Sequence, residues 1–235
     1  MLMMNRKQWG YLLLLAGLWF GWNGTAGAAV AELEQDGQRL YRLSNDCLTV
    51  VINPSCGGRV EEFRRTGGVN LVSPRPADLA PGGSGLGQER LRSGGVLVDR
   101  TAWVKWKVVA AGGENGRSFV TLENSDSPLH FVKTYTLRDG IASLTVDYAV
   151  DNPGTGDFIG NLWFITAPFP EGTGAMRYYY PLAEQSSWPD LAGGRASLEP
   201  VRWPETDGNI TVNHAAAGWV AALNDAGNGI LLETG

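Results

Sequence analysis

Histidine and cysteine are scarce in this chain of 235 residues, which carries two of each. The histidines are His130 and His214, and the cysteines Cys47 and Cys56 do not form a Cys-x-x-Cys pair. A structural or catalytic zinc site needs three or four such ligands at close spacing. We therefore expect no metal site, and we expect no cofactor.

Charged residues are also few, at 18% of the chain, with a formal net charge of −5. No basic cluster with interleaved aromatic residues occurs, which argues against binding to nucleic acid. The Gly-x-Ser-x-Gly motif of the α/β-hydrolase nucleophile is absent, so that class of enzyme is disfavoured.

The N-terminal apolar run, Tyr11–Phe20, is too short to cross a membrane comfortably. Arg6 and Lys7 precede it and Ala26-Gly27-Ala28 follows it, which is the pattern of a secretory signal peptide cleaved after Ala28. An uncleaved anchor is the alternative. We expect a signal peptide over residues 1–28, a secreted or periplasmic protein with no membrane span after cleavage, and one domain over residues 29–235.

Helical periodicity is missing from the rest of the chain, whereas alternation of apolar and polar residues recurs between Gly- and Pro-containing turns. This pattern predicts an all-β domain. The expected strands cover residues 48–53, 59–63, 96–98, 102–109, 118–123, 130–137 and 141–151. The expected turns are Gly57-Gly58, Gly112-Gly113, Asn115-Gly116 and Asp139-Gly140, and residues 73–87 form a long Pro- and Gly-rich loop.

Three motifs in order carry a resemblance to a known superfamily. Gly57-Gly58-Arg59 leads into a strand ending at Phe63 and a Gly-x-Asn-Leu turn; Lys133-Thr134-Tyr135-Thr136-Leu137 and the hairpin over residues 218–232 follow. Together they resemble the galactose mutarotase-like (aldose 1-epimerase-like) superfamily over residues 40–235. The resemblance implies an antiparallel β-supersandwich, here C-terminally shortened, whose concave face binds carbohydrate.

Catalytic members of that superfamily use a histidine as general acid and a C-terminal glutamate as general base. The corresponding segment here, Gly160–Thr166, has Asn161 and Trp163 and no histidine, and the chain ends at Gly235. Neither catalytic group carries over. The sequence therefore resembles a non-epimerase branch of unassigned function, and we expect a non-catalytic protein.

Aromatic side chains beside polar ones are typical of sugar sites, because sugars have apolar faces and hydroxyl edges. We expect a carbohydrate-binding groove within residues 160–205, with Trp163, Arg177, Trp188 and Trp203 as contacts. The alternative is that these tryptophans cap the core. His214 is a weaker candidate for an acid or base, with a structural role as its alternative.

The sequence leaves alternatives for the state of the cysteines and for the class of function. Cys47 and Cys56 either form a local disulfide or remain free thiols. The leading function is an exported carbohydrate-binding domain; a carbohydrate-active enzyme (epimerase, lyase or glycosidase relative) and a structural module of the cell envelope are the alternatives.

Overall fold

The computed structural model describes residues 27–72, 85–93, 96–97, 101, 104–167, 175–180, 196–197, 201–202, 219–224 and 226–233. Within these ranges every regular element is a β-strand, and all strand pairs are antiparallel. This confirms the expected all-β class. In the same ranges there is no helix of the length and hydropathy that crossing a membrane requires.

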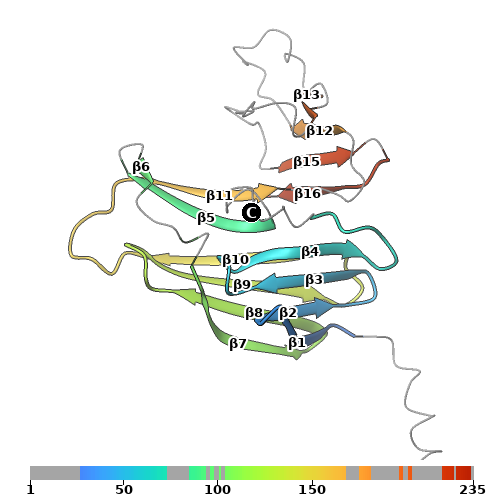
Figure 1. The fold of residues 1–235 in the computed structure, drawn as a ribbon, viewed down its shortest axis with the longest axis horizontal. Helices are drawn as coiled ribbons and strands as arrows, with labels where there is room; N and C mark the ends of the chain where they lie inside the picture. Colours follow the sequence, from blue (N-terminus) through green and yellow to red (C-terminus); the bar gives the residue numbers. More distant parts are fainter. Residues whose placement is uncertain are drawn as a thin grey trace, which may run out of the picture.

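The strands form three sheets (Figure 1). The seven-stranded sheet has the order β1-β2-β3-β4-β5-β11, with β6 also paired to β5; its strands are Ala29–Gln35, Gln38–Ser44, Leu48–Asn53, Arg59–Arg65, Gly85–Ser93, Asn161–Ala167 and Val96–Leu97. The four-stranded sheet, β10-β9-β8-β7, contains Leu144–Asp151, His130–Arg138, Arg117–Asn124 and Lys107–Glu114. The five-stranded sheet, β13-β12-β15-β16 with β14 on β12, contains Ala196–Ser197, Ala175–Tyr180, Trp219–Asn224, Gly229–Glu233 and Val201–Arg202.

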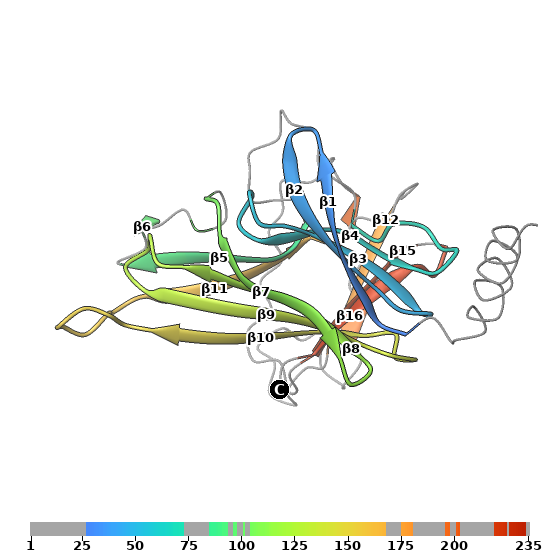
Figure 2. The same ribbon diagram turned by 90° about the horizontal axis from the view of Figure 1, so that it is seen from below.

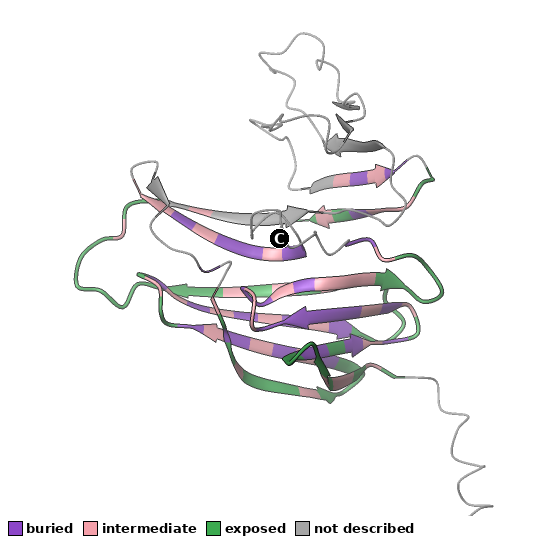
Figure 3. Ribbon diagram, in the orientation of Figure 1, coloured by how far each residue is buried: buried purple, intermediate pink, exposed green. Residues whose placement is uncertain are grey.

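The core lies between the seven-stranded and four-stranded sheets, which stack in two layers when seen from below (Figure 2). Leu48, Val50 and Ile52 of β3 are fully or almost fully buried, as their period-two spacing predicts. They belong to one apolar cluster with residues of the opposite sheet and with Ile230 of β16; its largest fully buried members are Trp106, Tyr135 and Phe131. Figure 3 shows the buried positions of β3 and β5 alongside the largely exposed β7.

The hairpin turns follow the glycine signals at several places. Gly57 and Gly58 both have positive φ, at 66° and 58°, and Asn115-Gly116 turns with φ of 50° and 71° between β7 and β8. These are left-handed conformations that glycine and asparagine adopt at low cost. Gly140 also has a positive φ of 67°, in the loop between β9 and β10.

Three boundaries differ from the expectation. β7 begins at Lys107 and not at residue 102, because Trp106 lies outside the ladder and donates its backbone N–H to the Pro54 carbonyl. Gly112-Gly113 lies inside β7 and not in a turn; β7 is an edge strand, and the ring of Phe119 on β8 lies beside Gly112. β10 begins at Leu144, three residues after the expected start at residue 141.

Both cysteines are free thiols, so the disulfide alternative is not formed. Cys47 precedes β3 and Cys56 lies in the turn beyond its other end. A straight strand of this length separates its two ends by about 20 Å, whereas bridged Cα atoms lie within about 7 Å of each other. The strand between the two residues therefore prevents the bridge that their sequence proximity allowed.

Candidate functional site

The candidate site is built on β5. One face of this strand contributes side chains to the core, and the other face carries polar side chains directed away from it. A bulge at Gly87, where the pairing with β11 shifts register, follows the apolar start of the strand. Beyond it Glu89 and Leu91 are fully buried on the core side. Since side chains of a strand alternate between faces, Gln88, Arg90 and Arg92 lie on the face turned away from the four-stranded sheet.

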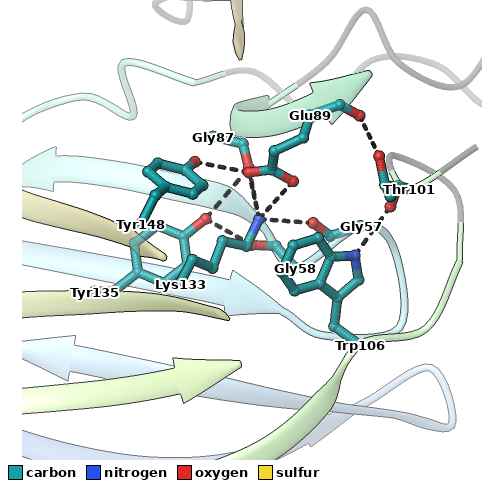
Figure 4. A network of polar contacts seen from close by, with 9 residues as sticks. All are labelled: Gly57, Gly58, Gly87, Glu89, Thr101, Trp106, Lys133, Tyr135 and Tyr148. Carbon is teal, nitrogen blue, oxygen red and sulfur yellow. Dashed lines mark hydrogen bonds and ion pairs between the residues drawn. The ribbon is translucent and has the colours of Figure 1, made fainter. Parts of the chain in front are cut away.

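On the core side, Lys133 of β9 forms an ion pair with Glu89 across the two sheets, and both side chains are fully buried (Figure 4). Lys133 Nζ lies 2.9 Å and 3.1 Å from the two carboxylate oxygens of Glu89. It also donates to the carbonyl oxygens of Gly57 at 2.9 Å and Gly87 at 2.8 Å. Its three N–H donors are thus satisfied by one carboxylate and two carbonyls.

Aromatic side chains surround this ion pair. The Tyr148 hydroxyl of β10 donates to Glu89 Oε1 at 2.7 Å, and the Tyr135 hydroxyl of β9 donates to the Gly58 carbonyl at 2.7 Å. The Trp106 ring lies 4.2 Å from Lys133 Nζ, which is a cation–π distance. Trp106 Nε1 in turn donates to the Thr101 carbonyl at 3.0 Å.

Glycine makes the close approach possible. A Cβ atom at Gly58 would lie 2.6 Å from Leu122 Cδ1 and 2.9 Å from Lys133 Cε, and one at Gly87 would lie 2.7 Å from the Tyr135 hydroxyl. Both glycines also have positive φ. The Gly-Gly turn and the Lys-x-Tyr-x-Leu strand, which carried the resemblance in the sequence, therefore contact each other in the structure.

Burial dominates the ionisation of this cluster. It raises the pKa of Glu89 and lowers that of Lys133, while their mutual attraction opposes both shifts. Burial also raises the pKa of the Tyr135 and Tyr148 hydroxyls, and the nearby Glu89 carboxylate adds to this. With the donors of Lys133, Tyr135 and Tyr148 used inside the core, the cluster joins the two sheets.

The outer face of β5 is arranged differently. Gln88 is fully buried there, whereas Arg90 and Arg92 are partly exposed. Burial, followed by the like charge of Arg92, lowers the pKa of Arg90. In the pairing register Arg90 stands opposite Trp163 of β11, and Arg92 stands opposite Asn161.

Polar side chains extend this face towards β3 and β4. Arg59 donates to Glu61 Oε1 at 2.8 Å, and the same oxygen accepts from Asn53 Nδ2 at 2.9 Å. Asn53 also donates to Gln38 Oε1 at 2.7 Å. Charged and amide groups that donate and accept hydrogen bonds therefore cover both β4 and β5 on this side of the sheet.

Only some of the predicted sugar-site residues lie in the part of the chain that the structure describes. Trp163 lies in β11 and Arg177 lies in β12, where it pairs with Leu223 of β15. Trp188, Trp203 and His214 lie outside the described residues. His130 begins β9 and contacts Glu123 at 3.0 Å and Asp151 at 3.6 Å, in line with a structural histidine.

Gln88, Arg90 and Arg92 were not foreseen as site residues. The start of β5 falls in what the sequence predicts as a loop, and β5 occupies residues 85–93. The available signal was the alternation in Gln88-Glu89-Arg90-Leu91-Arg92, which predicts a strand with one polar face. Among the described residues no group of three or more His, Cys, Asp or Glu side chains is placed to hold a metal ion.

Comparison with solved structures identifies the fold. A galactose mutarotase-like protein from Clostridium acetobutylicum superposes with a TM-score of 0.58 at 14% sequence identity, over 86% of this chain and 79% of that one. The chain has the galactose mutarotase-like fold. No protein-family model and no curated protein matches the sequence.

A second solved structure shares less with this chain. It is a TPR-domain containing protein from Parabacteroides distasonis, with a TM-score of 0.42 and 17% identity over 80% of this chain and 32% of that one. The likeness to the Clostridium protein confirms the expected β-supersandwich. At 14% identity it identifies the fold and leaves the ligand to be argued from the side chains.

Proposed function

We propose that this protein is an exported carbohydrate-binding protein and that it holds a sugar on the outer face of the seven-stranded sheet. The observation that carries the proposal is the polar strip of Gln88, Arg90 and Arg92 on β5, with Trp163 directly across from Arg90. Guanidinium and amide groups hydrogen-bond to sugar hydroxyls, and an indole ring packs against the C–H face of a pyranose.

Binding without turnover is part of this proposal. Catalytic members of the superfamily that the sequence resembles open the sugar ring with a histidine acid and a glutamate base. Here the segment expected to hold the acid forms β11, which has Asn161 and Trp163 and no histidine. General acid–base catalysis requires groups that exchange protons near neutral pH. An amide and an indole do not supply them.

Export agrees with the position of the first strand. β1 begins at Ala29, the residue after the predicted cleavage site, so removal of residues 1–28 leaves every strand of the described residues intact. N-terminal sequencing of the protein recovered from the periplasm or culture medium tests this part. A start at Ala29 is the expected result, and an intact Met1 in a membrane fraction would contradict it.

The binding test uses a glycan array followed by titration calorimetry on the mature chain. Arg90→Ala and Trp163→Ala are the informative variants, and Arg39→Ala is the matched control because Arg39 is exposed and pairs with Glu32 on the β1–β2 hairpin. Loss of a charged hydrogen bond costs about 1.5–3 kcal/mol, so we expect affinity to fall about tenfold to a hundredfold in Arg90→Ala.

Two outcomes would contradict the proposal. Absence of binding to any glycan at millimolar concentration would remove the carbohydrate function. Optical rotation measurements on aldoses test the non-catalytic part, and a rate of mutarotation above the uncatalysed rate would overturn it.

A further inference from the structure

The four-stranded sheet carries two ion pairs of opposite direction, one at each end of the β7–β8 ladder. At one end Lys107 of β7 lies 3.5 Å from Glu123 of β8. At the other end Glu114 of β7 lies 2.6 Å from Arg117 of β8. β7 is therefore positive and β8 negative at the first end, and the two signs are exchanged at the second end.

Both ion pairs lie on the face of the sheet that is turned away from the core. Ser118, Val120 and Leu122 of β8 are fully buried, so Arg117 and Glu123, which alternate with them, point outward. All four charged side chains remain accessible, with exposed fractions from 28% for Glu123 to 76% for Lys107. Each of them can contact a second molecule while it keeps its partner within the sheet.

The part of this outer face between the two ion pairs is uncharged on β7, β8 and β9. Its outward-facing residues are partly or largely exposed and are mostly small or β-branched: Ala110, Gly112, Phe119, Thr121, Val132, Thr134 and Thr136. The Thr121 and Thr134 hydroxyls bond to each other at 3.0 Å, so the sheet itself satisfies them. An uncharged centre with charged residues at the margin is typical of protein–protein interfaces.

The exchange of signs makes this face complementary to itself. A second copy can be turned over about an axis that lies in the face and runs across the strands. Its β7 then lies along β7 and its β8 along β8, in the opposite direction. Lys107 faces Glu114 of the second copy, and Glu123 faces Arg117 of the second copy. Two-fold symmetry repeats both contacts, which gives four attractive pairs and no contact between like charges at the two ends.

We propose that the outer face of the four-stranded sheet binds a second copy of this chain in a two-fold symmetric dimer. A two-fold interface uses the same patch on both subunits, so the patch has to complement itself, as this one does. Four strands about 4.8 Å apart and about 20–26 Å long present about 400–500 Å² on each copy. That area is at the low end for specific interfaces, so we expect a weak dimer with a dissociation constant of about 10 µM to 1 mM.

Sedimentation equilibrium of the mature chain, from about 10 µM to about 1 mM, tests this proposal. The wild-type protein is expected to be monomeric at the lowest concentration and to approach the mass of a dimer at the highest. Association should weaken as sodium chloride rises from about 50 to about 300 mM, because salt screens charge pairs that remain in contact with water.

Charge swaps test which ends face each other. Lys107→Glu with Glu123→Lys keeps the net charge and an ion pair within the sheet but reverses its direction, so that like charges face across the dimer. We expect the dissociation constant to rise about tenfold or more. Glu114→Arg with Arg117→Glu should have the same effect. All four substitutions together restore opposite charges, and the dissociation constant should return to within about threefold of the wild type.

Two further variants complete the test. Ala110→Arg places a long charged side chain at an exposed position in the uncharged centre and should abolish the dimer. Glu32→Arg with Arg39→Glu is the matched control, because it swaps an exposed ion pair on the β1–β2 hairpin, and it should associate as the wild type does. Thermal unfolding verifies that each variant is folded, and the wild-type measurement stands without the variants.

Each adverse outcome overturns a definite part of the proposal. A wild-type chain that stays monomeric at the highest concentration overturns the dimer. A dimer that survives Ala110→Arg or either single swap overturns its assignment to this face. Loss of the dimer in both swaps without recovery in the combined variant overturns the facing of the two ends. Carbohydrate binding is proposed on the other sheet and is tested separately.

Discussion

β5 carries ionised side chains on both of its faces, and the two faces use them differently. On the inner face Glu89 is fully buried and bound by Lys133 and Tyr148. On the outer face Arg90 and Arg92 are partly exposed and stand next to each other with like charge. The inner face joins two sheets, and the outer face carries the two arginines of the proposed binding surface. Alternate residues of one strand thus separate the scaffold from the proposed binding surface.

The largest test of this comparison is removal of the inner ion pair. Lys133→Met leaves the Glu89 carboxylate buried without its cation, and breaking a buried pair in this way costs about 3–5 kcal/mol. We expect the urea midpoint to fall accordingly. Since that loss is a large share of the stability of a typical domain, poor soluble yield of the variant is an expected form of the same effect.

Two controls sharpen that result. The double variant Lys133→Met, Glu89→Leu removes both charges and should recover a large part of the lost stability, because no isolated charge is left in the core. Lys107→Met makes the same substitution at an exposed lysine that lies 3.5 Å from Glu123, and its midpoint should match the wild type. Equal midpoints for Lys133→Met and Lys107→Met would show that the inner pair does not hold the sheets together.

The strands and turns around the inner face could be predicted from the sequence, but the buried ion pair could not. The Gly57-Gly58 turn and the alternation in residues 130–137 predicted strands and turns that the structure confirms. They did not predict that Lys133 is buried, because lysine is almost never buried unless it is paired, and its partner Glu89 lies 44 residues away. Contacts between strands distant in the sequence depend on how the sheets stack.

The site was harder to predict than the fold for a related reason. Tryptophan is a residue type typical of sugar contacts. The predicted groove was therefore placed in residues 160–205, where three tryptophans occur. The arginines of β5 have no such signal alone; their meaning depends on the bulge at Gly87 and on the register that sets Arg90 against Trp163. A bulge reverses which residues face outward, and residue spacing in the sequence did not reveal it.

Substitution of the bulge glycine is the intermediate test. Gly87→Ala places a Cβ atom in a left-handed conformation with φ of 73° and 2.7 Å from the Tyr135 hydroxyl, which is fully buried. We expect a loss of about 1–3 kcal/mol in the free energy of unfolding, measured by urea denaturation. Gly37→Ala is the matched control: it has a φ of 72° but open space around the added atom. Equal losses in both variants would show that backbone conformation alone, and not the contact with Tyr135, sets the requirement for glycine.

The smallest effect is expected on the solvent side of the four-stranded sheet, where the pair of His130 and Glu123 is only partly buried. The hydrogen bond with His130 lowers the pKa of Glu123, and Lys107 adds to the shift. A carboxyl whose pKa is lowered by folding stabilises the protein above its unfolded pKa, and this contribution is lost as the pH falls through the folded pKa. We therefore expect His130→Ala to melt a few degrees at most below the wild type near pH 5. The difference in melting temperature should narrow towards pH 3 as Glu123 takes up its proton.

Asp151 also faces His130 at 3.6 Å, so Asp151→Asn serves as the control for the charge of Asp151. A gap that widens in acid would mean that this partly exposed pair behaves like the buried one, and the contrast between inner and outer polar groups would fail.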